Sequence, residues 1–227
     1  MDPKTKKELI KYLRDFTTES RWNKIRETVQ ERTRHISVVV EDIYQPHNAS
    51  AVLRSCDGFG IQDVHIIENK NEFEASSQVT IGADQWLSLY RYNAHKKDNT
   101  ASCFTSLKES GYQVIATSPH KNDINLNDLD ITQKTALVFG SEIDGISDKA
   151  TEMADGFLKI PMYGFSESFN ISVSAAICLY NITRRLRNSD ISWKLGENEM
   201  DEIMLQWLRQ SIRAGEKLQE TFLKQAK

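Results

Sequence analysis

Three polar segments carry residue types that a binding or catalytic site requires, and each lies next to a short apolar run. The first, NASAVLR, holds Asn48 and Arg54, and the second, GSEIDG, holds Glu142 between two glycines. The third, YGFSESFN, contains Ser168 and Asn170 and passes directly into an apolar helical pattern. Carboxylates and guanidinium groups orient polar ligands, and the start of a helix offers free N–H groups to anions. These residue types suggest a ligand site built from loops.

Taken singly, each segment has a simpler interpretation. Gly140 and Gly145 are spaced as neither G-x-G-x-x-G nor G-x-x-x-x-G-K-[ST], so a dinucleotide fingerprint and a P-loop are excluded. The second segment alone is typical of a strand turn, and the third alone is equally typical of a capped core helix. Arg54 alone is typical of a surface ion pair. The order of the three segments along the chain is therefore the informative feature.

The segments lie within alternating strand and helix patterns. Short β-branched or apolar runs predict strands at 35–41, 63–68, 87–92, 112–118, 135–140 and 156–160. Amphipathic or capped stretches predict helices at 3–16, 20–34, 48–60, 100–111, 147–154 and 170–187, with one or two more within 199–225. This alternation favours an α/β domain with a mostly parallel sheet and helices on both faces. Ligands of such sheets bind beyond the carboxyl ends of the strands, where the three segments fall.

Helix boundaries can also be predicted from the polar residues. Asn48 is the expected N-terminal cap of helix 48–60, with Gly58 or Gly60 at its end. Ser168 or Asn170 is the expected cap of helix 170–187.

Composition excludes several classes of protein. The chain has 227 residues, 39% hydrophobic and 27% charged, with a formal net charge of −3. No window approaches the roughly 18–20 apolar residues of a membrane span, and the N-terminus lacks the apolar core of a signal peptide. The three cysteines are far apart and lack C-x-x-C spacing, which predicts reduced, buried thiols in a cytoplasmic protein. No cluster has metal-ligand spacing, so no metal is expected.

Charge is distributed unevenly along the chain. Residues 1–35 carry ten Lys and Arg against six Asp and Glu, whereas residues 36–183 carry ten against nineteen. Residues 184–227 carry nine against seven. Basic ends around an acidic middle indicate either contacts with a polyanion or ordinary solvated helix faces. We expect a basic helical extension at 1–34, an α/β domain at 35–187 and a helical extension at 188–227.

The three segments, in this order, resemble the SpoU/TrmH branch of the SPOUT RNA methyltransferases over residues from about 36 to 187. The family's N-x-x-A-x-x-R and G-x-E-x-x-G motifs match at NASAVLR and GSEIDG, and its third motif matches at IPMYGFSESFNISVSAA. Phe169 stands where the family usually has Leu, and Ile171 stands where Val is usual. Glu167 replaces a common Gln and adds a negative charge beside the expected site.

The resemblance implies a fold, a cofactor and an assembly. It implies a deep trefoil knot at the C-terminal end of the domain, a homodimer, and S-adenosylmethionine as the donor of a methyl group to a ribose 2′-hydroxyl. The residues implied as cofactor-binding are Thr117, Gly140, Glu142, Gly145, Ile160, Met162, Ser168 and Phe169.

The same resemblance implies the catalytic residues. Arg54 is the principal one, and Asn48, Glu142, Ser168 and Asn170 are implied to orient Arg54, the ribose or the loops. A guanidinium is normally a permanent cation, so Arg54 is better suited to stabilise a developing alkoxide or to grip the adjacent phosphate than to take a proton. Whether Arg54 acts in its own subunit or across a dimer is left open.

Short helical extensions at both ends resemble the tRNA-modifying members of the family, which methylate the ribose of guanosine-18 in the D-loop. The alternatives are the same chemistry on ribosomal RNA, or a knotted RNA-binding protein without activity. The cations expected to contact RNA are Arg21, Arg26, Arg34, Arg184 and Arg187, and Arg32 adds to the basic N-terminal segment.

Overall fold

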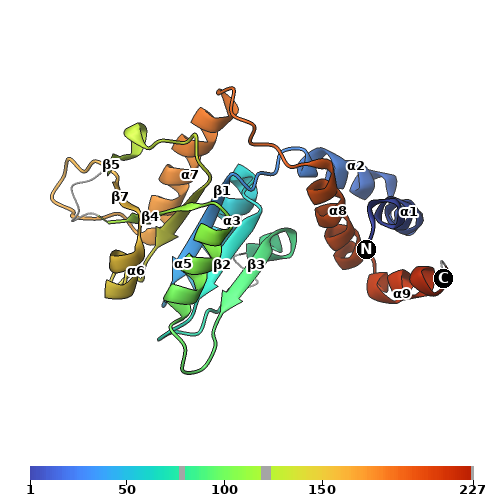
Figure 1. Cartoon of the computed structure of the whole chain (residues 1–227), viewed down its shortest axis with the longest axis horizontal. Coiled ribbons are helices and arrows are strands. Elements are labelled where there is room, and N and C mark those ends of the chain that lie inside the picture. Colours follow the sequence, from blue (N-terminus) through green and yellow to red (C-terminus); the bar gives the residue numbers. More distant parts are fainter. Residues whose placement is uncertain (77–79, 119–123, 226–227) are drawn as a thin grey trace. The chain divides into compact units, whose positions relative to one another are not determined.

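The computed structural model describes residues 1–76, 80–118 and 124–225, and the chain divides into two compact units (Figure 1). The larger unit is Arg34–Trp193, and the smaller unit joins Met1–Thr33 to Lys194–Lys227. The two ends of the chain, expected as separate extensions, therefore pack together.

The larger unit is built on a seven-stranded sheet of order β3-β2-β1-β6-β4-β7-β5. All pairings among the described strands of this sheet are parallel, which confirms the predicted α/β fold with a parallel sheet. The two-residue strand β5 was not predicted, because so short a run carries no periodic signal. The strands are β1 (Ile36–Glu41), β2 (Asp63–Ile67), β3 (Ser88–Tyr92), β4 (Gln113–Thr117), β5 (Ile124–Asn125), β6 (Thr135–Phe139) and β7 (Gly156–Lys159).

Helices cover both faces of this sheet, as expected from its continuous apolar strands (Figure 1). On one face, α3 (Pro46–Phe59) and α7 (Ile171–Arg187) pack into a core that includes Val38, Val64 and Leu137. On the other face, α5 (Asn99–Glu109) and α6 (Asp148–Met153) pack over a second core around Val39 and Val138. The knot implied by the family resemblance stays a prediction.

The order of the strands changes direction between β1 and β6. Strand β1 pairs with β2 on one side and with β6 on the other, so that Val38 lies opposite both Val64 and Leu137. The chain runs from β1 outward through β2 to β3 and fills the other half of the sheet afterwards. Ligands of open α/β sheets bind at the carboxyl ends of the strands where the chain changes direction in this way.

The helix caps were predicted correctly in part. Helix α3 begins at Pro46 with Gln45 as its N-cap, so Asn48 lies inside the first turn and the predicted capping role is wrong. Proline suits the first helical position because its missing N–H has no partner there, which moves the helix start two residues upstream. Gly60 ends α3 with a left-handed φ of 80°. Asn170 caps α7, because its Oδ1 accepts a hydrogen bond from the Ser172 N–H at 2.8 Å.

The smaller unit contains the helices α1 (Pro3–Arg14), α2 (Glu19–Val29), α8 (Glu197–Ser211) and α9 (Gly215–Gln225). Helix α1 packs its buried Leu9 and Leu13 against α8. Helix α2 ends at Val29, earlier than predicted, and Thr33 forms an antiparallel bridge with Lys194.

Two groups of N-terminal cations are held within this unit. The Arg32 side chain is fully buried, with its guanidinium 5.2 Å from the centre of the Trp207 ring. Our expectation that Arg32 contributes to an RNA-binding surface is therefore wrong. Lys6 and Lys7 pair with Glu202 and Glu197 of α8 at 2.5 and 2.6 Å. Part of the excess positive charge at the N-terminus thus has carboxylate partners.

Candidate active site

A pocket of about 630 Å³ opens where β4, β6 and β7 end. Its volume lies within the range of small-molecule and cofactor sites. It is lined by segments from the second and third motifs, which lie about twenty residues apart in the sequence. All eight residues expected to bind a cofactor line it, namely Thr117, Gly140, Glu142, Gly145, Ile160, Met162, Ser168 and Phe169.

The second motif forms a closed loop. Ser141 and Gly145 exchange both backbone hydrogen bonds, at 2.8 and 3.0 Å, and Gly145 has a left-handed φ of 71°. A Cβ at Gly140 would lie only 2.2 Å from the carbonyl carbon and oxygen of Gly145. The close backbone approach that requires glycine at this position is therefore made by the loop to itself.

Glu142 joins this loop to the other two motifs. Its carboxylate accepts hydrogen bonds from the backbone N–H groups of Tyr44 and Gln45, at 3.1 and 3.4 Å. Asn48 Nδ2 donates to Glu142 Oε1 at 2.6 Å, and Asn170 Nδ2 donates to Asn48 Oδ1 at 3.1 Å. A chain of hydrogen bonds therefore runs from the second motif through the first to the third, at the edge of the pocket.

This arrangement holds Glu142 in its ionised form. Partial burial by itself raises the pKa of the carboxyl, but the hydrogen bonds from Asn48 and from the Tyr44 N–H outweigh burial and leave the pKa below the ordinary value. An ionised Glu142 can only accept hydrogen bonds, so it fixes the Asn48 amide with its nitrogen toward Glu142 and its oxygen toward Asn170.

Arg54 lies apart from this network. It is exposed on α3, six residues beyond Asn48, and is not among the described residues that line the pocket. Six residues of helix correspond to about 9 Å along the axis. The structure thus brings together four of the five residues expected to be catalytic (Asn48, Glu142, Ser168 and Asn170) and leaves Arg54 outside.

The charges around the pocket are acidic. Glu142, Asp144 and Glu167 line it, and the described lining residues include neither lysine nor arginine. Such a pocket favours a cationic ligand by simple Coulomb attraction. Its apolar lining, which includes Phe139, Leu158, Ile160 and Phe169, suits a flat, weakly polar ring system.

Several groups at this site were not predicted from the sequence. Asp144 lines the pocket from within the second motif, and its position between two glycines was the available signal. The N–H groups of Tyr44 and Gln45 also went unnoticed, because backbone donors leave no mark in the sequence.

The five arginines expected to contact RNA lie in different settings. Arg21 and Arg26 are exposed on α2 of the smaller unit, and Arg184 is exposed on α7 beside Tyr180, in a cleft of about 470 Å³. Arg187 stacks over the Trp193 ring at 4.6 Å. Arg34 pairs with Asp63 at 3.1 Å, at the amino-terminal ends of β1 and β2 and so opposite the pocket.

Among the described residues, the cysteines and the residue types that bind metals indicate no second type of reaction. Cys56, Cys103 and Cys178 are buried as predicted, and burial raises the pKa of Cys178 to about 12. Within the described part of the chain, no group of His, Cys, Asp and Glu is arranged to hold a metal ion. No described helix has the length and apolar character needed to span a membrane. A cytoplasmic location stays a prediction.

The parallel sheet, the strand-end pocket and the three linked motifs define a known class of protein. Residues 35–180 match the model of the SpoU rRNA methylase family, so the chain belongs to that family and the predicted resemblance is confirmed.

The similarity to individual relatives covers most of the chain. The tRNA (guanosine(18)-2'-O)-methyltransferase of Borreliella burgdorferi is 39% identical over 204 residues, which cover 90% of this chain and 91% of the relative. The enzyme of the same name from Thermus thermophilus is 32% identical, covering 85% of this chain and 97% of the relative. The crystal structure of the TrmH/SpoU tRNA modifying enzyme of A. aeolicus superposes with a TM-score of 0.75 at 30% identity. That superposition covers 85% of this chain and 97% of the other.

Proposed function

We propose that the protein transfers the methyl group of S-adenosylmethionine to a ribose 2′-hydroxyl of tRNA, and that the nucleotide is guanosine-18. The observation that carries this proposal is the hydrogen-bond chain Glu142–Asn48–Asn170, which links all three motifs at the edge of an acidic pocket. The two relatives named for this activity align with 90% and 85% of the chain.

The pocket fits the donor in three respects. Its volume suits a nucleoside-sized molecule, its apolar lining can hold an adenine ring, and its carboxylates attract the positively charged sulfonium and ammonium groups. When bound there, the donor supplies a methyl group on a positively charged sulfur.

The protein's own residues have positioning roles in this proposal. Gly140 and Gly145 keep the second-motif loop closed beside the donor site, and Asn170 caps α7 while bonding Asn48. The 2′-oxygen attacks the methyl carbon, the carbon–sulfur bond breaks, and the hydroxyl proton leaves to a neighbouring base or phosphate. We propose that Arg54 stabilises the developing alkoxide or holds the adjacent phosphate, since a guanidinium stays protonated.

The direct test is methylation of unmodified total RNA with labelled donor, followed by mapping of the labelled nucleotide. We expect a single labelled 2′-O-methylguanosine at position 18. Label confined to ribosomal RNA would contradict the choice of substrate. Calorimetry that detects no binding of either the donor or its demethylated product would contradict the activity itself.

We propose that tRNA binds mainly through the basic surface of the smaller unit, in keeping with the expected division of the chain into a domain at 35–187 and two extensions. Because residues 1–33 pack against α8 through Leu9 and Leu13, deleting them would expose a core and confuse the result. Charge removal at Arg21 and Arg26 is the cleaner experiment, since both side chains are exposed.

We expect Arg21→Ala with Arg26→Ala to weaken tRNA binding and to flatten its dependence on salt. For each phosphate that the variant no longer neutralises, the slope of log affinity against log salt should fall by roughly 0.7–0.9. Filter binding at several salt concentrations measures both quantities. The matched control is Lys108→Ala with Lys149→Ala, which removes two cations of surface ion pairs from the larger unit. Equal slopes for the two double variants would contradict a role for the smaller unit.

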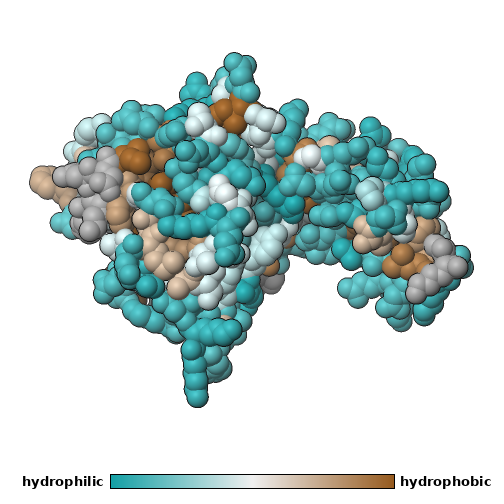
Figure 2. Space-filling model, viewed as in Figure 1, coloured by the Kyte–Doolittle hydropathy of each residue, from teal (hydrophilic) through white to brown (hydrophobic). Residues whose placement is uncertain are grey.

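We also propose that the protein is a homodimer, with α7 and the third-motif loop at the interface. Val173 and Tyr180 of α7 are exposed, as are Tyr163 and Phe165 of the loop. Ile177, also on α7, is partly buried and packs against the core. Figure 2 shows hydrophobic surface gathered on the larger unit near β5 and β7. An apolar surface of this kind marks an interaction site.

Sedimentation is expected to show a dimer at assay concentrations. Tyr180→Glu, on the exposed part of α7, should produce monomers and lower activity, because a buried unpaired carboxylate opposes association. The control Tyr12→Glu lies in the smaller unit and should leave the dimer intact. An active monomeric Tyr180→Glu variant would contradict the proposed interface.

A further inference from the structure

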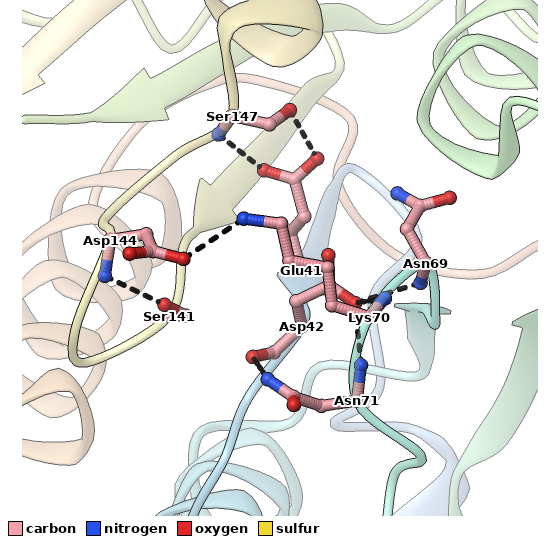
Figure 3. Close-up of polar contacts among 8 residues, drawn as sticks. All are labelled: Glu41, Asp42, Asn69, Lys70, Asn71, Ser141, Asp144 and Ser147. Carbon is pink, nitrogen blue, oxygen red and sulfur yellow. Dashed lines mark hydrogen bonds and ion pairs between the residues drawn. The ribbon is translucent and has the colours of Figure 1, made fainter.

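A second carboxylate at the end of β1 has no assigned role, although it is fully buried and fully bonded. Glu41 is only 1% exposed. Its Oε2 accepts the Ser147 N–H at 2.9 Å, and its Oε1 accepts the hydroxyls of Ser147 and Thr100 at 2.8 and 2.6 Å. Figure 3 shows the Glu41 side chain reaching from β1 to Ser147, where the second-motif loop ends.

Glu41 and Glu142 hold the same loop from opposite ends. Glu142, near the start of the loop, reaches out to the first-motif segment at Tyr44, Gln45 and Asn48. Glu41, in the first strand, reaches the other way and binds the far end of the loop at Ser147. Through these hydrogen bonds, the two carboxylates connect the carboxyl ends of the neighbouring strands β1 and β6.

The next residue after β1 provides a third attachment. Asp42 is buried and adopts a left-handed φ of 51°, and its Oδ1 accepts the N–H groups of Asn69 and Lys70 at 2.7 and 2.8 Å. Lys70 Nζ then reaches Asp144 of the second-motif loop at 2.9 Å (Figure 3). Because the Lys70–Asp144 pair is exposed, its own contribution is small, and the buried Glu41 bonds dominate.

We propose that Glu41 is a positioning residue for the donor site, acting through Ser147 on the loop that carries Gly140, Glu142 and Gly145. This inference rests on the proposed function, because the donor occupies the pocket that the loop lines. Glu41 is not among the described residues that line the pocket, and its effect comes from holding the loop closed before the donor binds.

The property of Glu41 that matters in this proposal is the length of its side chain. A glutamine of the same length can accept the Ser147 N–H with its oxygen and donate to the two hydroxyls with its nitrogen. An aspartate keeps the charge but is shorter by one methylene and cannot span the same distance. Thr100→Val removes the bond from Thr100 to Glu41, together with the bond that Asn69 Nδ2 donates to the Thr100 hydroxyl, and leaves both bonds to Ser147 in place.

The experiment compares Glu41→Asp, Glu41→Ala, Glu41→Gln and Thr100→Val by calorimetry with S-adenosylmethionine and by amide hydrogen exchange of residues 140–147 without ligand. Glu41→Asp and Glu41→Ala should weaken donor binding by about tenfold or more and speed exchange in the loop, because buried donors lose their acceptor. Glu41→Gln and Thr100→Val should stay within about twofold of the unchanged protein, since the bonds to Ser147 persist.

Two outcomes would overturn the inference. One is a folded Glu41→Asp variant with unchanged exchange in the loop. The other is a Thr100→Val variant that loses as much donor affinity as Glu41→Asp, since Glu41 would then act as a general support of the fold. If the unchanged protein binds no donor, the proposed function fails, and the exchange measurement still decides whether Glu41 holds the loop.

Discussion

Replacing Arg54 by alanine is expected to lower the rate of methyl transfer by about a hundredfold or more, the usual cost of removing one group that stabilises developing negative charge. The affinity for S-adenosylmethionine should stay nearly unchanged, because Arg54 is exposed on α3 and is not among the described residues lining the pocket. Single-turnover methylation of tRNA and calorimetry with the donor measure the two quantities separately.

Arg54→Lys is the matched control. A lysine keeps the charge but cannot reproduce the planar fork of a guanidinium, so this variant should also be poor. Near-normal turnover of Arg54→Ala would show that Arg54 is an ordinary surface residue, and near-normal turnover of Arg54→Lys would show that a positive charge alone is sufficient. In the proposed homodimer, mixing Arg54→Ala with Gly140→Val subunits tells which pocket Arg54 serves, because activity returns only if Arg54 acts on the partner's donor.

The second large effect is expected at Gly140. A valine there should abolish measurable donor binding, and alanine should weaken it strongly. A Cβ at this position would lie 2.2 Å from the Gly145 carbonyl and 2.4 Å from the Ile146 nitrogen, so the loop must open. A shift of about 1 Å in a positioned group can cost a hundredfold in rate. Calorimetry with the donor measures the effect, and circular dichroism checks that the variant is folded.

Gly58→Ala is the control for Gly140. Apart from its chain neighbours and its own helix backbone, a Cβ at Gly58 meets no described heavy atom within 4 Å. This variant should bind the donor normally, and alanine in a helix should not reduce stability. A folded Gly140→Val protein that binds the donor tightly would place the donor site elsewhere.

The sequence predicted the sheet well, because most of its strands are short apolar or β-branched runs. Six of the seven strands were located to within one or two residues, and only β5 was missed. The eight residues expected around the donor do gather in one pocket, since loops that follow neighbouring parallel strands meet at the same edge. These are consequences of periodicity and topology, which the sequence carries directly.

The contacts that depend on long-range pairing were not predictable. Asn48 has the residue type of a cap, but its amide is engaged by Glu142, 94 residues away. Arginine is a residue type that often binds phosphate, but Arg34 forms an ion pair with Asp63. Arg32 is buried over Trp207, a residue from the other end of the chain. In each case a partner distant in sequence decides what the side chain does.

The central claim is methylation of one ribose oxygen, and a pair of tRNA transcripts tests it most directly. One transcript carries guanosine at position 18, and the other carries 2′-deoxyguanosine there and is otherwise identical. With labelled S-adenosylmethionine, we predict incorporation of one methyl group per molecule into the first transcript and none into the second. Equal labelling of both transcripts would contradict the account.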